Sequence, residues 1–237
     1  EKTKKFILES EFVLKNLSDD IIKKIYKDLI FSKPSVQWKN YYNMIFDETH
    51  YMHYLNFNNA NIINLGVDNG FEIPFFLSKK IKKIINVDPT GEEYLEDYVR
   101  IFTEQFKEKL EFEKSYLYKS DNVYKASNKS LKKITLEEIL KKYSIEKDII
   151  IKSDIEGAEI EMVDELEKIA HVTRPQIAIS IYHLDSSLEP INSQITLIPK
   201  RLISFLKDYN FYVKHYTYNQ TETVFYCIPK EKINLSN

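Results

Sequence analysis

The chain has 237 residues, of which 43% are hydrophobic and 30% charged, and its formal net charge is −2. This length suits one large domain or one domain with an appendage. The balanced charge argues against a dedicated nucleic-acid-binding protein, which normally carries a basic stripe. Cys227 is the only cysteine, so no internal disulfide can form, and a reducing compartment is the simpler setting. No apolar run approaches the roughly 20 residues of a membrane-spanning helix, and we expect a cytoplasmic protein.

Residues 1–60 lack the two-residue alternation of strands and are predicted to be helical. One helix is predicted with Ser18 as its N-cap, because acidic residues and then a 3.6-residue apolar stripe follow. A second, aromatic-rich helix is predicted for residues 37–55. Since the pattern changes at the next segment, we expect a helical cap or appendage in residues 1–60 and the main domain in residues 61–237.

Short apolar runs alternate with amphipathic stretches in the main domain. The predicted strands are residues 61–67, 83–88, 111–118, 148–154 and 176–183, followed by a β-hairpin around Asn219 and Gln220. Among the predicted helices, one begins with a capping box of Thr135 and Glu138. Strands and helices at this spacing predict a doubly wound, parallel α/β sheet. The hairpin has no helix between its strands, so the seventh and last strand is predicted to be antiparallel to the one before.

Glycines and an acid follow the first two predicted strands. Gly66 permits a tight turn and the close approach of a ligand to the backbone, and Gly70 lets the next helix pack tightly. Asp88 ends the second strand, where a carboxylate can accept hydrogen bonds from a ribose diol. Ligands of open α/β sheets bind beyond the carboxyl ends of the strands, so these residues predict a nucleoside site. The spacing is not GxGxxG, which counts against a dinucleotide.

Asp154 and His183 end the fourth and fifth predicted strands and therefore fall at the same carboxyl edge. A histidine there can take a proton near neutral pH, while the aspartate orients it or binds substrate. The other functional interpretation is Mg²⁺ or Mn²⁺ held by Asp154, His183 and either Asp185 or Glu159. The structural alternative is a hydrogen-bonded, partly buried histidine. The start of the next helix favours negative charge, which explains one of the two acids Glu156 and Glu159.

Five segments resemble, in order, the motifs of FkbM-type S-adenosylmethionine-dependent methyltransferases: NIINLGVDNGFEIPFFL, INVDP, ITLEEIL, DIIIKSDIEGAEIEMV and ISIYH. The resemblance covers residues 61–185. Its most specific part is IKSDIEGAE, which is similar to the family signature K-x-D-x-E-G-x-E. The resemblance implies a Rossmann-like class I methyltransferase fold, with a seven-stranded sheet and an antiparallel last strand. Residues 61–237 would then be the S-adenosylmethionine-binding catalytic domain.

The resemblance also implies a role for each candidate residue. Gly66 and Gly70 would lie under the methionine part of the cofactor. Asp88 would bind the ribose hydroxyls, and Tyr116, near the end of the third strand, would border the adenine. The aspartate and histidine that end the fourth and fifth strands would face the methyl group and the acceptor.

The chain departs from the family pattern at Asn64, where the family usually has an acid that helps to hold the methionine amino group. Asparagine can accept a hydrogen bond from an ammonium group but lacks the charge, and Asp68 is the residue we expect to compensate. Charge-assisted hydrogen bonds contribute about 1.5–3 kcal/mol against about 1 kcal/mol for neutral ones, so cofactor binding is expected to be about tenfold weaker. Lys152 and Glu159 match the signature, and the sequence does not say whether they are structural.

We therefore expect an S-adenosylmethionine-dependent O-methyltransferase that acts on a hydroxyl of a bacterial surface sugar or glycan precursor, with His183 as the base. One alternative is an NAD-dependent oxidoreductase, against which the glycine spacing and the hairpin count. Another is a non-catalytic methyltransferase-like scaffold, which Asn64 alone supports. Acceptor contacts are expected from residues 1–60 and from the segment after His183. The acceptor, the need for a metal and the oligomeric state are open.

Overall fold

The structure is a computed structural model, and it describes residues 2–31, 50–93, 95–117, 132–183, 193–216 and 222–233. The chain divides into two compact units. One is Asn56–Pro175, which we call the parallel unit. The other combines Glu1–Leu55 with Gln176–Asn237, and we call it the antiparallel unit. In the ranges that the structure describes, no helix combines the length and the apolar character needed to cross a membrane.

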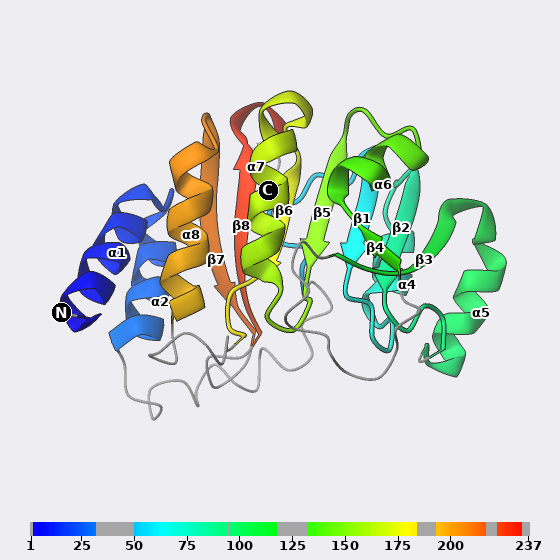
Figure 1. The fold of residues 1–237 in the computed structure, drawn as a ribbon, viewed down its shortest axis with the longest axis horizontal. Coiled ribbons are helices and arrows are strands. Elements are labelled where there is room, and N and C mark those ends of the chain that lie inside the picture. The colour runs from blue at the N-terminus through cyan, green and yellow to red at the C-terminus, as the bar shows by residue number, and fades with distance from the viewer. Residues whose placement is uncertain are drawn as a thin grey trace. The chain divides into compact units, whose positions relative to one another are not determined.

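The sheet of the parallel unit has five strands, all parallel to their neighbours (Figure 1). In sheet order they are β4 (Lys132–Ile134), β3 (Leu110–Leu117), β2 (Lys83–Asp88), β1 (Asn61–Leu65) and β5 (Ile149–Ser153). β1, β2 and β5 are buried along almost their whole length, as expected for strands covered on both faces. The chain proceeds from β1 toward β4 on one side and returns as β5 on the other. The carboxyl ends of β1 and β5 therefore form a topological switch point, where ligands of such sheets bind.

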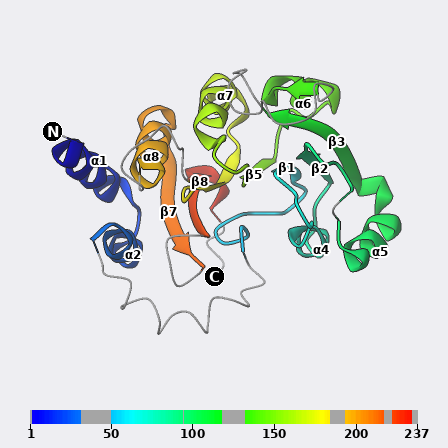
Figure 2. The same ribbon diagram turned by 60° about the horizontal axis from the view of Figure 1, so that its bottom comes forward.

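In the described part of this unit, four helices and one short 3₁₀ turn accompany the sheet. They are α4 (Glu72–Leu77), α5 (Asp97–Gln105), η2 (Lys107–Lys109), α6 (Leu136–Lys142) and α7 (Glu159–Thr173). Figure 2 shows α4 and α5 on one side of the strands and α6 and α7 on the other. The predicted capping box is present at α6. Thr135 Oγ1 accepts from the backbone N–H of Glu138 at 3.2 Å, and the Glu138 carboxylate accepts from the backbone N–H of Thr135 at 2.9 Å.

The antiparallel unit joins the two ends of the chain. Its elements are α1 (Lys2–Asn16), α2 (Asp20–Phe31), β6 (Gln176–Ser180), α8 (Ser193–Phe205), β7 (Tyr209–His215), β8 (Thr223–Pro229) and η3 (Lys230–Lys232). β8 lies between β6 and β7 and is antiparallel to both. α1 packs on α8 and α2 packs on β7. The hydroxyl of Tyr26 donates to the carbonyl oxygen of Ile195 at 2.9 Å, so the N-terminal helices are bonded to the C-terminal part of the chain.

The α/β class, the parallel sheet and the antiparallel hairpin strand are confirmed, but the predicted number of seven strands is wrong, because the described residues contain eight. The additional strand is β4, which pairs with the end of β3. A strand of three residues is too short to show the alternation by which strands are recognised. The predicted helix over residues 37–55 lies mostly outside the described residues, as do Asn219 and Gln220 of the hairpin. The boundary between residues 60 and 61 stays a prediction.

Candidate functional site

The loop after β1 approaches the end of β5 very closely. Gly66 has a φ of +75°, and a Cβ atom there would lie 1.7 Å from the carbonyl oxygen of Asp154. Gly70 has a φ of +74°, and a Cβ atom there would lie 2.6 Å from a methyl group of Leu95. Both backbone conformations favour glycine. The Asp154 backbone oxygen leaves no room for a side chain at Gly66, whereas at Gly70 the obstructing atom is the end of a leucine side chain that can shift. The close approach expected of a ligand at Gly66 is made here by the backbone of the chain itself.

Asp88, at the end of β2, holds this glycine loop. Its Oδ2 accepts from the backbone N–H groups of Val67 at 2.8 Å and Asp68 at 3.3 Å. Its Oδ1 accepts from the backbone N–H of Thr90 at 2.8 Å and from the Thr90 hydroxyl. An ionised carboxylate has about four acceptor positions, so the loops after β1 and β2 use all of them. A ribose hydroxyl could bind Asp88 by replacing the hydroxyl of Thr90.

Three polar side chains form a row across the sheet of the parallel unit, beside the glycine loop. Asn64 on β1 pairs in register with Asn86 on β2 and with Lys152 on β5. Side chains in register on parallel strands point to the same face of a sheet. All three are at most 3% exposed. We call Asn64, Asn86 and Lys152 the polar row.

Glu72, the first residue of α4, completes a hydrogen-bonded network with the polar row. Asn64 Nδ2 donates to Glu72 Oε1 and to Asn86 Oδ1, in each case at 3.0 Å. Lys152 Nζ donates to Glu72 Oε1 at 3.1 Å and to the carbonyl oxygen of Gly66. It also donates to the carbonyl oxygen of Leu65 at 3.5 Å. Lys152 thus joins a carboxylate to the glycine loop.

Glu72 is therefore the acid that contacts Asn64, and sequence reasoning missed it. Asp68, the residue expected to compensate for Asn64, has an exposed side chain that accepts from the amide of Asn69 at 3.0 Å. The sequence signal that could have identified Glu72 is an acid in the first turn of the helix that follows Gly70. Tyr116 is the penultimate residue of β3, where it was expected, and its side chain is half-buried.

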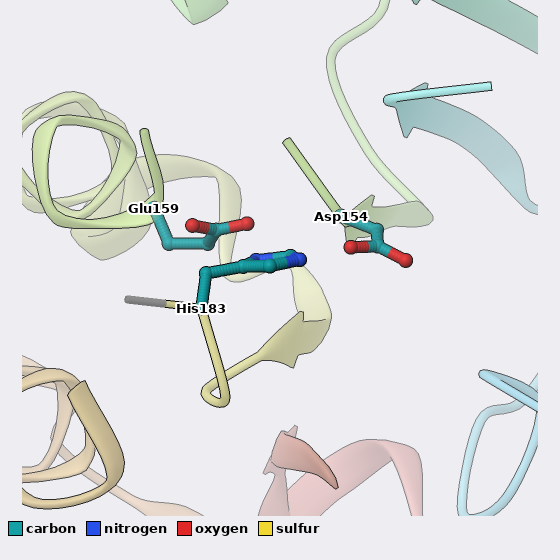
Figure 3. Close-up of side chains that lie close together, drawn as sticks. All are labelled: Asp154, Glu159 and His183. Atoms are coloured by element: carbon teal, nitrogen blue, oxygen red, sulfur yellow. The ribbon is translucent and has the colours of Figure 1, made fainter. Parts of the chain in front are cut away.

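The acids that follow β5 have different surroundings. Both carboxylate oxygens of Glu159 accept backbone hydrogen bonds, from Ile155 at 2.8 Å and from Gly157 at 2.9 Å, and the residue is fully buried. Glu159 therefore braces the turn that leads into α7, which is a structural role. Asp154 is half-buried, and one of its carboxylate oxygens lies within 4.8 Å of one of Glu159 (Figure 3).

His183, also drawn in Figure 3, belongs to the antiparallel unit, where it is the third residue after β6. It is buried, and its ring centroid lies 4.2 Å from that of Tyr182. Asp154 and Glu159, both in the parallel unit, offer carboxylate oxygens of the kind that divalent cations take. Asp185, the other proposed ligand, lies outside the described residues.

Aromatic and histidine rings gather in the antiparallel unit. Tyr54 stacks on Tyr212 with centroids 4.2 Å apart and an interplanar angle of 9°. His50 stacks on Tyr51 at 4.2 Å and lies 4.4 Å from the ring of Tyr216. Tyr54 is 38% exposed, so part of this ring cluster is open to solvent.

No protein-family model matches the sequence, and no match was found among curated proteins. Among solved structures, the methyltransferase FkbM from Methylobacillus flagellatus matches 93% of this chain with a TM-score of 0.71 and 16% identity. The fold is that of an FkbM-type methyltransferase. At this identity the likeness shows the fold alone, and the match spans 58% of the length of that structure. The Rossmann-like class I methyltransferase fold implied by the sequence resemblance is therefore confirmed.

Two further structures are less similar. Spermidine synthase from Thermotoga maritima has a TM-score of 0.46 and 12% identity over 86% of this chain and 64% of its own. The 1,6-didemethyltoxoflavin-N1-methyltransferase of Burkholderia thailandensis has a TM-score of 0.45 and 10% identity, over 82% of this chain and 85% of its own length. These two add no argument about function.

Proposed function

We propose that the chain is an S-adenosylmethionine-dependent O-methyltransferase. The observation that carries the proposal is the glycine loop at the switch point, held by Asp88 and Lys152 in a methyltransferase fold. The residues present fit the cofactor, because Asn64 Oδ1 is buried and has no hydrogen-bond partner among the described residues. Such an acceptor suits the amino group of a ligand.

In this proposal the residues divide along the length of the cofactor. The methionine part would lie at Gly66 and Gly70, the ribose at Asp88 and the adenine near Tyr116. Bound there, S-adenosylmethionine would supply an electrophilic methyl group on its sulfonium, and the electron pair of the broken bond would stay on the sulfur of S-adenosylhomocysteine.

His183 is the proposed base, and Asp154 orients the acceptor. The acceptor hydroxyl gives its proton to an imidazole nitrogen of His183 while its oxygen forms the bond to the methyl carbon. Holding the two reactants in line supplies most of the acceleration, and the positioned base contributes a factor of about 10²–10⁴. The second candidate role of these residues is to hold Mg²⁺ or Mn²⁺ with Glu159, which the proximity of the Asp154 and Glu159 carboxylates favours. The two backbone bonds to Glu159 count against that role.

The proposed acceptor is a hydroxyl of a bacterial surface sugar or a glycan precursor. Aromatic faces pack well against the C–H faces of sugar rings, and the half-exposed Tyr54 stacked on Tyr212 offers such a face. Tyr54 also belongs to residues 1–60, from which acceptor contacts are expected.

Calorimetric titration with S-adenosylhomocysteine and with NAD tests the proposal. We expect S-adenosylhomocysteine to bind and, at 100 times its Kd, to stabilise the protein by about 2.7 kcal/mol. Binding of NAD instead would support an oxidoreductase, and binding of neither would support a scaffold. Mass spectrometry of nucleotide sugars and glycans incubated with enzyme and S-adenosylmethionine then identifies the acceptor by its gain of one methylene.

A further inference from the structure

The network around the polar row contains two acceptor atoms that have no donor among the described residues. The Lys152 ammonium donates to two carbonyl oxygens and to Glu72 Oε1. Within the described residues, hydrogen bonds reach Glu72 only at Oε1. Asn64 Oδ1 has no partner there either, although Asn64 is fully buried. Two neighbouring side chains therefore each offer an acceptor oxygen with no donor.

The polar row is costly for the fold. Ile63, Ile85 and Ile151 occupy the preceding register positions of the same three strands and are fully buried. An apolar row would avoid the cost of burying a lysine and two amides. A buried polar group without a partner adds a further cost. The acceptors lie at the switch point, so a ligand with a donor group would recover part of this cost.

We propose that Glu72 Oε2 and Asn64 Oδ1 together bind the ammonium group at the amino-acid end of the cofactor. This inference rests on the proposed function. An ammonium group has three donors and a positive charge, and the carboxylate supplies the negative charge that Asn64 lacks. Lys152 and the amide of Asn64 both hold Oε1, which orients the carboxylate and leaves Oε2 for the ligand. The acid absent from position 64 is thus provided by the first turn of α4.

A pair of ligands tests this contact with a Glu72→Gln variant. S-adenosylhomocysteine has the amino-acid end, and 5′-methylthioadenosine has the nucleoside and the sulfur without it. We expect the variant to bind S-adenosylhomocysteine about tenfold more weakly, the difference between a charge-assisted and a neutral hydrogen bond. Its Kd for 5′-methylthioadenosine should not change. An unchanged Kd for S-adenosylhomocysteine, or an equal loss for both ligands, would overturn the proposal, and the equal loss would mean that Glu72 only positions the loop.

Two further variants keep the test independent of folding. Glu92→Gln makes the same chemical change at an exposed acid of the parallel unit and should leave both Kd values unchanged. Asn64→Asp combined with Glu72→Gln returns the carboxylate to the strand, keeps a counter-charge for Lys152, and should recover most of the lost affinity. If this double variant binds 5′-methylthioadenosine normally but S-adenosylhomocysteine no better than Glu72→Gln, the proposal is wrong. A wild-type protein that binds neither ligand would instead refute the proposed function.

Discussion

The two units place polar groups differently in their sheets. In the parallel unit, a lysine and two asparagines are buried on the central strands and a glutamate joins them. In the antiparallel unit, β8 is buried over its whole length, and its Tyr226 hydroxyl bonds the hydroxyl of Tyr216 at 2.6 Å. Buried charges are expensive and hydroxyl pairs much less so. Under the proposed function the parallel unit is the one that holds the charged ligand, so we expect changes there to affect cofactor binding first.

The largest effect is expected from Gly66→Ala. The new Cβ atom would meet the Asp154 carbonyl, and alanine would also be strained at a φ of +75°. Backbone strain and overpacking each cost about 1–3 kcal/mol, so we expect a loss of about 2–6 kcal/mol. Urea unfolding measures this loss, and thermal stabilisation by S-adenosylhomocysteine should disappear.

Gly91→Ala is the matched control for this glycine. Gly91 has a φ of +64°, but its nearest atom would lie 3.4 Å from the new Cβ, an ordinary contact. We expect only the cost of the left-handed conformation, about 1–2 kcal/mol. Equal losses for the two variants would show that the close approach of Gly66 to β5 has no special importance.

The second-largest effect is expected from a change at His183, which should affect the rate of methyl transfer but not cofactor binding. His183→Ala, in the antiparallel unit, should lower the rate of methyl transfer by about 10²–10⁴-fold because the base is lost. Its Kd for S-adenosylhomocysteine should stay that of the wild type. Single-turnover assays with labelled S-adenosylmethionine, together with calorimetry, measure both quantities.

His171→Ala removes an exposed histidine from α7 and should change neither quantity. A His183→Ala variant with the wild-type rate would contradict the assignment of the base. Loss of wild-type activity in EDTA, with recovery in Mg²⁺ or Mn²⁺, would assign His183 and Asp154 to a metal instead.

The smallest effect is expected from Glu113→Gln, which changes a buried acid of the parallel unit away from the polar row. Burial raises the pKa of Glu113. The hydrogen bonds from Lys142, Tyr143 and Ser115 together lower the pKa by more than burial raises it, so the pKa lies below its usual value of 4.5. The carboxylate therefore stabilises the fold above about pH 4.5, and this contribution is lost as the pH falls through the lowered pKa. We expect the variant to lose about 1–3 kcal/mol at neutral pH.

Urea unfolding of wild type and variant at pH 7 and at successively lower pH tests this prediction. The difference in stability should shrink below pH 4.5, and S-adenosylhomocysteine should bind both proteins equally. Glu111→Gln, two residues earlier on β3, breaks a more exposed pair with Lys83 and should cost at most about 1 kcal/mol. A difference that grows as the pH falls would contradict the prediction.

Sequence periodicity and capping predicted most elements of the fold, because the long strands and helices carry strong local patterns. The Thr135 capping box is one such case. The start of α2 was less well predicted. Asp19 Oδ1 accepts from the N–H of Ile22 at 3.2 Å, whereas the Ser18 hydroxyl accepts from the backbone of Phe211. That second bond joins residues 193 positions apart, and no local pattern reports it.

The candidate site shows the same limit. The glycine loop and Asp88 were found because their spacing follows strand ends. The partnership of Glu72 with Asn64 and Lys152 depends on how α4 meets two strands, so the sequence did not indicate it. Glu159 could be identified as part of a signature, but its structural role became clear only from its two backbone hydrogen bonds.

The polar row also has a consequence for how the strands align. Isoleucine occupies two positions of β1, two of β2 and three of β5, and both faces of these strands are buried. At Ile62, a sliding error of one residue against β5 would still oppose isoleucine to isoleucine in either direction. At Asn64, however, the same error would set its amide against isoleucine or valine and would separate the Lys152 ammonium from its carboxylate. The row thus penalises misaligned pairings and helps to select a single register for these strands.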